Sequence, residues 1–327
     1  MLSRFNSVAG AAVFAVTALT GISSAQADEV TLSAASCLPI GSPPSLPFEA
    51  VVAEINERGK GVVQIDLVGG APAIGNMFTL AQKMSKGVYD MLGCPEAFGN
   101  ILPEASVFHL AEKPYSELRE NGGLQYMADL LEAKGIHYVG RHHTFGPFYL
   151  WLAKKIDKPD LTGLHLRTAP AYTSFFRSLG ATVQTSGPSQ IYTYMENGTV
   201  QGFGWPALAW IPSFTPVTKY RVEPGFHDAT LHTLMNQKKW TSLSDEQRDL
   251  INTVVMEFEV KSELFGTEVQ AKLDGLFSKL EEQGIKAIKF EGAEADEWLK
   301  AAKDTGWAEV FELSPEHGAK LHALWTK

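Results

Sequence analysis

The 327-residue sequence lacks the features of most nucleic-acid-binding and membrane-spanning proteins. It has no block of basic residues, and 28 Lys and Arg against 37 Asp and Glu give a formal charge of −9. An acidic chain without a basic patch is not expected to bind nucleic acid or an anionic membrane surface. After residue 27 no stretch is long and apolar enough to span a membrane, which takes about 20 residues.

One apolar stretch does occur, at the N-terminus. A single cation, Arg4, precedes an uncharged and mostly apolar run from Val8 to Ile22, and Ala25-Gln26-Ala27 follows. This layout is typical of a secretory signal peptide, residues 1–27, cleaved after Ala27. A membrane anchor is the alternative, but the run is short for a spanning helix. We therefore expect an exported chain.

Cysteine is scarce, with only Cys37 and Cys94. In an exported chain the two can form one disulfide, and two free buried thiols are the alternative. The sequence does not decide between them, because the bond depends on the geometry of the fold. The spacing of the two cysteines is not that of a metal site.

Signatures of common enzymes are also missing. The chain has no G-x-S-x-G elbow and no Walker loop or H-E-x-x-H motif. Gly202–Ala207 matches G-x-G-x-x-A formally, but Pro206 and further aromatic residues follow in place of a helix with an acidic partner. His142 and His143 are adjacent, so on a strand they point to opposite faces and do not suggest a metal site. No catalytic residue, metal or cofactor is expected.

What the chain does contain is an alternation of strand and helix patterns. Strands are predicted at 29–39, 61–70 and 88–94, with helices at 46–59 and 77–87 between them. This alternation predicts an α/β fold with a parallel sheet and helices on both faces. Ligands of such sheets bind beyond the carboxyl ends of the strands. The residues at these ends are Ser36, Cys37, Glu96, Ala97 and Phe98.

A second α/β pattern begins near residue 150. Later, residues 244–283 form one helical pattern, opened by a capping box of Ser244 and Gln247. A helix of that length would measure about 60 Å, more than the width of a small domain. We therefore expect two domains with a cleft between them: residues 28–150 with about 238–280, and residues 151–237 with about 281–327. The helix 244–283 is expected to span both.

Arg167 ends a short apolar strand that begins at Leu164. Because a guanidinium is always charged, its burial requires a partner. The partner is either a protein carboxylate, Asp160 or Glu196, or a carboxylate from outside, which the planar fork of the guanidinium matches. Tyr172 opens the next helix, whose N-terminus also favours an anion.

Motifs in fixed order surround Arg167. Asp160-Leu161-Thr162-Gly163 and Arg167 fit the pattern D-L-x-G-x-K-x-R, and Leu179-Gly180-Ala181 and then Gly198–Gly202 follow. In this the chain resembles the solute-binding proteins of tripartite ATP-independent periplasmic (TRAP) transporters, the DctP family. The resemblance extends over nearly the whole chain after residue 27.

The resemblance implies a periplasmic receptor that catalyses nothing. It implies that the two domains close on a small organic acid by a hinge motion, and that Arg167 forms a two-pronged salt bridge with the ligand's carboxylate. The partners implied are the small and large membrane permease subunits, and a monomer is expected. The alternatives are an ABC-type binding protein and an exported α/β enzyme that uses His142 or His143 as a general base.

Departures from the family pattern indicate what kind of ligand to expect. Trp205 stands where family members often carry an Asn that bonds the carboxylate. A second family Arg is absent from the stretch TFGPFYLW, which includes Phe148, and Arg141 is the nearest cation. We expect a ligand with one carboxylate and an apolar or aromatic body, although aromatic rings could instead surround a quaternary ammonium group. The expected ligand-binding residues are Arg167, Trp205, Phe203, Phe148, Tyr172, Glu96, Phe98, Cys37 and Arg141.

Overall fold

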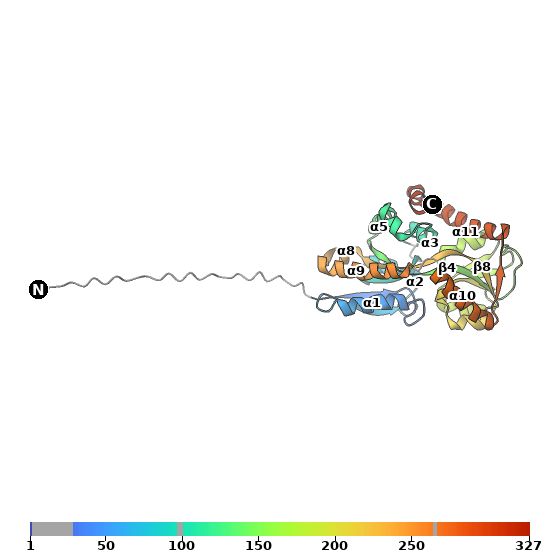
Figure 1. Cartoon of the computed structure of the whole chain (residues 1–327), viewed down its shortest axis with the longest axis horizontal. Helices are drawn as coiled ribbons and strands as arrows, with labels where there is room; N and C mark the ends of the chain where they lie inside the picture. The colour runs from blue at the N-terminus through green and yellow to red at the C-terminus, as the bar shows by residue number, and fades with distance from the viewer. Residues whose placement is uncertain (2–28, 97–100, 264–266) are drawn as a thin grey trace.

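The computed structural model describes residue 1 and residues 29–96, 101–263 and 267–327. The predicted signal peptide and two predicted strand-end residues, Ala97 and Phe98, lie outside these ranges. The described chain forms an α/β fold in which helices lie on both sides of a central sheet (Figure 1).

Within the described residues one sheet has nine strands in the order β2-β1-β3-β8-β4-β7-β5-β6, with β9 paired to β8. The strands are β1 (Val30–Ser36), β2 (Val63–Gly70), β3 (Met91–Pro95), β4 (Ile136–Leu152), β5 (His165–Thr168), β6 (Thr182–Thr185), β7 (Gly202–Pro206), β8 (Tyr220–Asn236) and β9 (Lys286–Lys289).

The sheet is mixed, which corrects the prediction of a parallel sheet. The alternation is right within two groups: β1 is parallel to β2 and β3, and β5 is parallel to β6 and β7. Between the groups lie two strands of 17 residues each, β4 and β8. They are antiparallel to each other, β8 is antiparallel to β3, and β4 is antiparallel to β7. The sequence pattern did not identify β8.

The carboxyl ends of the two parallel groups point toward the middle of these long strands. β3 ends at Pro95, which pairs with Leu231 of β8. β7 ends at Pro206, which pairs with Phe148 of β4, and Phe148 pairs with Phe226 of β8. The ladder between β4 and β8 has several register shifts in this middle region. One region therefore receives the strand ends of both halves.

The α-helices cover this sheet, and their ends follow from the sequence. Pro47 stands in the first turn of α1 and Arg58 in its last turn, where each is favoured. The predicted capping box of Ser244 and Gln247 is confirmed at the start of α9. The helices are α1 (Leu46–Arg58), α2 (Met77–Ser85), α3 (Val107–Leu110), α4 (Tyr115–Glu120), α5 (Gly123–Glu132), α6 (Thr173–Ser178), α7 (Ile191–Glu196), α8 (Gln237–Ser242), α9 (Asp245–Ser262), α10 (Thr267–Glu282), α11 (Ala293–Leu313) and α12 (Gly318–Trp325).

The prediction of one helix over residues 244–283 is wrong, because the chain forms α9 and α10 instead. α9 ends at Ser262, and Glu263 has a non-helical ψ of 53°. The Glu263 carboxylate accepts hydrogen bonds from the backbone N–H of Tyr115 at 3.1 Å and from Arg141 Nη2 at 3.0 Å. These bonds fix the chain against α4 and β4 at the point where the helix stops.

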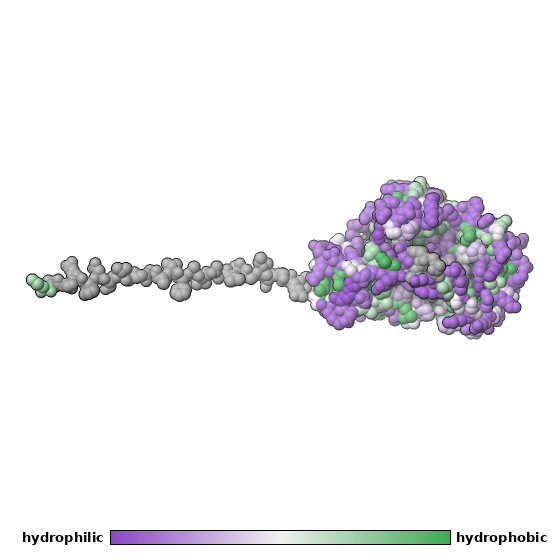
Figure 2. All heavy atoms as spheres, in the orientation of Figure 1, coloured by the Kyte–Doolittle hydropathy of each residue, from purple (hydrophilic) through white to green (hydrophobic). Residues whose placement is uncertain are grey.

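Two apolar clusters stabilise the fold. In the smaller one, α1 and α9 pack on one face of the β1–β3 end of the sheet, through side chains such as Val51, Ile55 and Val255. The larger cluster includes the other face and the whole β5–β7 end. Hydrophilic residues dominate the molecular face shown in Figure 2. In the described part of the chain, no helix has the length and apolar character needed to cross a membrane.

Candidate functional site

A small cavity lies where the carboxyl ends of the two parallel groups meet, with a volume of about 60 Å³. Its wall is largely apolar, with a few polar side chains, as is usual for small-molecule sites. The first part of the chain contributes Leu38, Pro44, Met77, Pro95 and Glu96; β4 and β8 contribute Phe145, Phe148, Ala229, Thr230 and Leu231; the second part contributes Arg167, Ala169, Ala171, Tyr172, Pro188, Trp205, Pro206 and Ala209.

Arg167 is 2% exposed and lies in the wall of this cavity. Its Nη1 donates hydrogen bonds to the Tyr172 hydroxyl at 2.9 Å and to the Gly204 carbonyl at 3.3 Å, and its Nη2 donates to the Ser186 carbonyl. A guanidinium has five N–H donors, and Nε has no acceptor in the described residues. One N–H on Nε and one on Nη2 therefore remain for a ligand.

Every protein acceptor of Arg167 is a neutral oxygen. Among the described residues no acid forms an ion pair with it, and burial lowers the pKa of its guanidinium below the ordinary value. The two acids considered from the sequence are engaged elsewhere: Asp160 pairs with Lys158 at 3.2 Å, and Glu196 accepts from the Tyr192 hydroxyl. The structural ion pair considered for Arg167 is therefore not formed.

Tyr172 holds the Arg167 side chain in place. Its hydroxyl accepts from Arg167 and donates to the Gly204 carbonyl at 2.7 Å. The Tyr172 ring lies directly against Gly204, where a Cβ atom would come within 2.5 Å of the ring. Glycine at 204 is thus required for this arrangement, and burial raises the pKa of the Tyr172 hydroxyl.

Glu96 follows β3 and is the acidic residue of the cavity wall. It is 6% exposed, and Oε2 is buried with no hydrogen-bond partner in the described residues. Burial raises the pKa of this carboxyl to about 8, although the backbone and side chain of Thr230 donate to it. The cavity thus contains one permanent cation, Arg167, and one carboxyl group that does not pair with it.

Cys37 and Cys94 form a disulfide, with a Cα–Cα distance of 4.9 Å. The alternative of two free thiols is therefore wrong. The bond is possible because β1 and β3 are neighbours, with Ser36 paired to Gly93. Cys37 itself lies outside the small cavity, in a larger adjoining groove of about 580 Å³. The disulfide fixes the strand ends from which Leu38, Pro95 and Glu96 reach the cavity.

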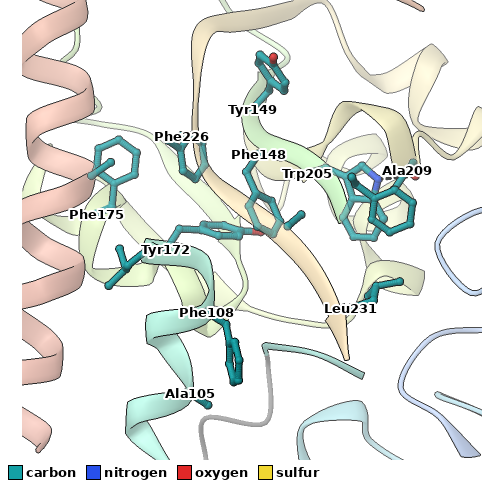
Figure 3. Close-up of a cluster of buried hydrophobic side chains, with 14 of the residues drawn as sticks. Ala105, Phe108, Phe148, Tyr149, Tyr172, Phe175, Trp205, Ala209, Phe226 and Leu231 are labelled. Atoms are coloured by element: carbon teal, nitrogen blue, oxygen red, sulfur yellow. Dashed lines mark hydrogen bonds between the residues drawn. The ribbon is translucent and has the colours of Figure 1, made fainter. Parts of the chain in front are cut away.

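Aromatic rings form much of the cavity wall. The Phe148 and Tyr172 ring centroids lie 5.1 Å apart, and Tyr172 points toward Phe148 in Figure 3. Trp205 lies on the other side, where its Nε1 donates to the Ala209 carbonyl at 2.7 Å. Phe203, two residues earlier on β7, is fully buried against Phe214 and does not line the cavity. Its position does not support the expected ligand contact.

Arg141 does not line the small cavity but lies in an adjoining polar pocket, which shares Thr230 with it. It pairs with Glu263 at 3.0 Å, and its guanidinium carbon lies 3.7 Å from the centroid of the Tyr115 ring. These contacts join β4 to α4 and to the end of α9. The structure therefore gives Arg141 a role in packing and not in the cavity wall.

His142 and His143 do not approach the cavity wall. His142 contacts the Thr233 hydroxyl at 3.0 Å, and burial lowers the pKa of the two imidazoles to about 3 and about 4 respectively. In the described residues, no group of His, Cys, Asp and Glu has the geometry of a metal site.

Sequence reasoning missed the residues that reach the cavity from β8, Ala229, Thr230 and Leu231, because β8 itself was not predicted. Met77 and Pro188 were also missed; they line both the cavity and the larger groove. Met77 opens a predicted helix directly after a strand, so the strand-end rule could have indicated it.

Comparison with known proteins identifies the family. The family model for DctP, bacterial extracellular solute-binding protein family 7, matches residues 41–312. The chain belongs to this family. Its members are substrate-binding receptors and not enzymes, so this receptor is not the exported enzyme considered as an alternative. The resemblance to TRAP solute-binding proteins is confirmed.

Individual relatives of this DctP-family receptor are distant. A solute-binding protein of Roseobacter denitrificans is 23% identical over 254 residues, which are 73% of this chain and 75% of that protein. A TRAP periplasmic solute-binding protein of Desulfovibrio salexigens, solved with orotic acid, has a TM-score of 0.78 at 18% identity, covering 90% of this chain and 97% of that one. An extracytoplasmic solute receptor of Bordetella pertussis that binds pyroglutamic acid has a TM-score of 0.77 at 15% identity, covering 91% and 100%. These structures share the fold.

Proposed function

We propose that this receptor captures a small organic acid in the periplasm and delivers it to the membrane permease subunits of a TRAP transporter. Residues 1–27 direct export and are removed after Ala27. The mature receptor is a monomer of two domains, with boundaries close to residues 150 and 238, and it closes on its ligand by bending at the irregular middle of β4 and β8.

One observation supports the chemistry of capture most strongly. Arg167 is buried at a cavity wall, has only neutral protein acceptors, and keeps two N–H donors free. A buried cation without an anion is costly, and a carboxylate accepts two parallel N–H bonds from a guanidinium. The ligand's carboxylate therefore completes the site, and the apolar wall with Phe148 and Trp205 encloses its body.

The related structures agree with this ligand class. Orotic acid and pyroglutamic acid, the ligands of the two structural relatives, each carry a single carboxylic acid on a small ring. Arg141 lies outside the cavity wall, so among the described residues that line it no second side-chain cation is available for a dicarboxylate. We therefore assign a monocarboxylate.

The proposal is tested by a thermal-shift screen of purified protein that has been unfolded and refolded to release bound ligand. The panel contains monocarboxylates with small rings, dicarboxylates, sulfonates and betaines. A ligand that binds the folded state raises the melting temperature by mass action. We expect hits among the monocarboxylates, and a loss of affinity of about 100-fold in Arg167→Lys, because two charge-assisted hydrogen bonds lose their geometry.

Arg221→Lys is the matched control, because Arg221 is 1% exposed but lies outside the cavity. It is expected to bind the same compounds as the wild type. Hits confined to dicarboxylates, or monocarboxylate binding that Arg167→Lys leaves unchanged, would contradict the proposal.

A further inference from the structure

Glu96 is the second buried ionisable group of the cavity without a complete set of partners. Its side chain lies in the same wall as Arg167, and the two do not form an ion pair. Oε2 is buried and has no hydrogen-bond partner in the described residues. A buried acceptor without a donor is costly unless a ligand supplies one.

Within the described part of the chain, no cation is among the groups that shift the pKa of Glu96. Thr230 on β8 donates to the carboxyl, and Asp228, also on β8, adds negative charge nearby. The remaining titratable neighbours are the hydroxyl groups of Tyr115 and Tyr172, whose pKa values the charge of Glu96 raises. The ionisable groups around Glu96 are therefore Asp228 on β8, with Arg141 of β4 beyond it, Tyr115 on α4 and Tyr172 on η3 (Pro170–Tyr172).

The cavity is thus polarised. Arg167 makes one part of the wall positive, while Glu96 gives another part a carboxyl group, beside which Asp228 adds negative charge. Phe148, Tyr172 and Trp205 belong to the same wall, and aromatic ring faces attract cations. A ligand with only a carboxylate would satisfy Arg167 and leave Glu96 without a donor. A ligand with a carboxylate and a protonated amine satisfies both.

We propose that the ligand is a small zwitterion, an amino or imino acid, whose carboxylate binds Arg167 and whose protonated nitrogen donates an N–H to Oε2 of Glu96. This inference rests on the proposed binding of a carboxylate by Arg167 and adds the second functional group of the ligand. The wall between these two groups is largely apolar, which suits a ligand whose body is a short carbon chain or one small ring.

The assignment has a consequence for pH dependence. In the empty cavity burial keeps the pKa of Glu96 at about 8, so the carboxyl is mostly protonated at neutral pH. A protonated amine binds the ionised carboxylate, so binding releases a proton. The affinity for a zwitterion should therefore rise as the pH increases from 6 to 8, by up to about tenfold per pH unit.

The test uses pairs of nearly isosteric acids that differ only in nitrogen: L-proline against cyclopentanecarboxylate, and pipecolate against cyclohexanecarboxylate. Calorimetry on the refolded, disulfide-bonded protein measures both affinity and proton release, the latter from buffers of different ionisation enthalpy. We expect the nitrogen-containing member of a pair to bind at least about tenfold more tightly and to release close to one proton at pH 7.

Glu96→Gln is the decisive variant. It should abolish both the preference for nitrogen and the proton release. Glu104→Gln is the matched control: Glu104 is also 6% exposed with an unpartnered Oε2, but its Oε1 accepts from Ser314 and it does not line the cavity. This variant should keep the wild-type preference and proton release.

The outcomes separate this inference from the proposed function. Equal binding within each pair, tighter binding of the nitrogen-free acids, or a nitrogen preference that Glu96→Gln retains would overturn the zwitterion while leaving the role of Arg167 intact. Binding that is unchanged in Arg167→Lys would overturn the carboxylate site itself. A failure of every pair to bind would overturn both proposals, because the panel matches the size and charge that the cavity requires.

Discussion

Arg167 and Arg221 are both almost completely buried, but their surroundings differ in charge. Arg221 donates to Glu223, contacts Glu281 at 3.5 Å and lies 3.5 Å from the centroid of the Phe277 ring. Arg167 donates, among the described residues, to a tyrosine hydroxyl and two backbone carbonyls. Arg221 has two carboxylates within the protein as counter-charges, although its Nη1 has no hydrogen-bond partner in the described residues. No carboxylate of the described residues pairs with Arg167, and this difference is the basis for the proposal that Arg167 serves a ligand.

The largest expected effect is a difference in folding stability between variants of the two arginines. Arg221→Met should lower the free energy of unfolding by about 3 kcal/mol, because it leaves the partly buried Glu223 without its cation. Arg167→Met leaves no carboxylate unpaired and relieves the burial of a charge, so its cost in the ligand-free protein should be about 1 kcal/mol. Denaturant unfolding of both variants, after refolding without ligand, measures the two values. Equal losses, or a larger loss for Arg167→Met, would mean that Arg167 has a structural anion.

A smaller effect concerns Glu96, whose buried Oε2 also lacks a hydrogen-bond partner in the described residues. Its pKa is raised to about 8 in the folded protein, above the unfolded value, so the folded state retains a proton that the unfolded state has lost. Stability from this group therefore decreases as the pH rises toward 8. Between pH 6.5 and 8 the ligand-free wild type should lose about 2 kcal/mol relative to Glu96→Gln.

Melting temperatures of the wild type, Glu96→Gln and Glu104→Gln at these two pH values check this expectation. The wild type should fall by several degrees relative to Glu96→Gln. Other groups that titrate in the same range cancel in the comparison, because all three proteins share them. Parallel behaviour of the wild type and Glu96→Gln would show that the Glu96 carboxyl is not held in its protonated form.

The parts of the fold that were predicted from sequence are those with local signals. The helices α1 and α2 and the strands β1 to β3 have regular apolar spacing and clear turn residues, and they were identified. β8 was missed because Pro224 and Gly225 interrupt its pattern, and such residues usually indicate a turn. It remains one strand because it pairs with β3, β4 and β9, which is information that a local pattern does not contain. The break after α9 likewise depends on distant partners of Glu263.

The residues of the candidate site were likewise predicted only in part. Arg167, Tyr172 and Glu96 were identified from strand and helix ends, since these positions reflect the general geometry of α/β sheets. Phe203 and Arg141 were named for their chemistry, but the direction of each side chain depends on register. Phe203 lies three residues before the end of β7, where it packs on Phe214 and does not line the cavity. The disulfide became decidable only when β1 and β3 were seen to be neighbours.

The central claim is that the anion missing at Arg167 is the ligand's carboxylate, and a thermodynamic cycle tests it most directly. The affinities of the best monocarboxylate and of its neutral primary amide are measured for the wild type, Arg167→Met and Arg221→Met. We predict that the wild type and Arg221→Met prefer the acid by about 100-fold, and that Arg167→Met binds acid and amide almost equally. A preference for the acid that survives in Arg167→Met would contradict the account, because the carboxylate would then bind elsewhere.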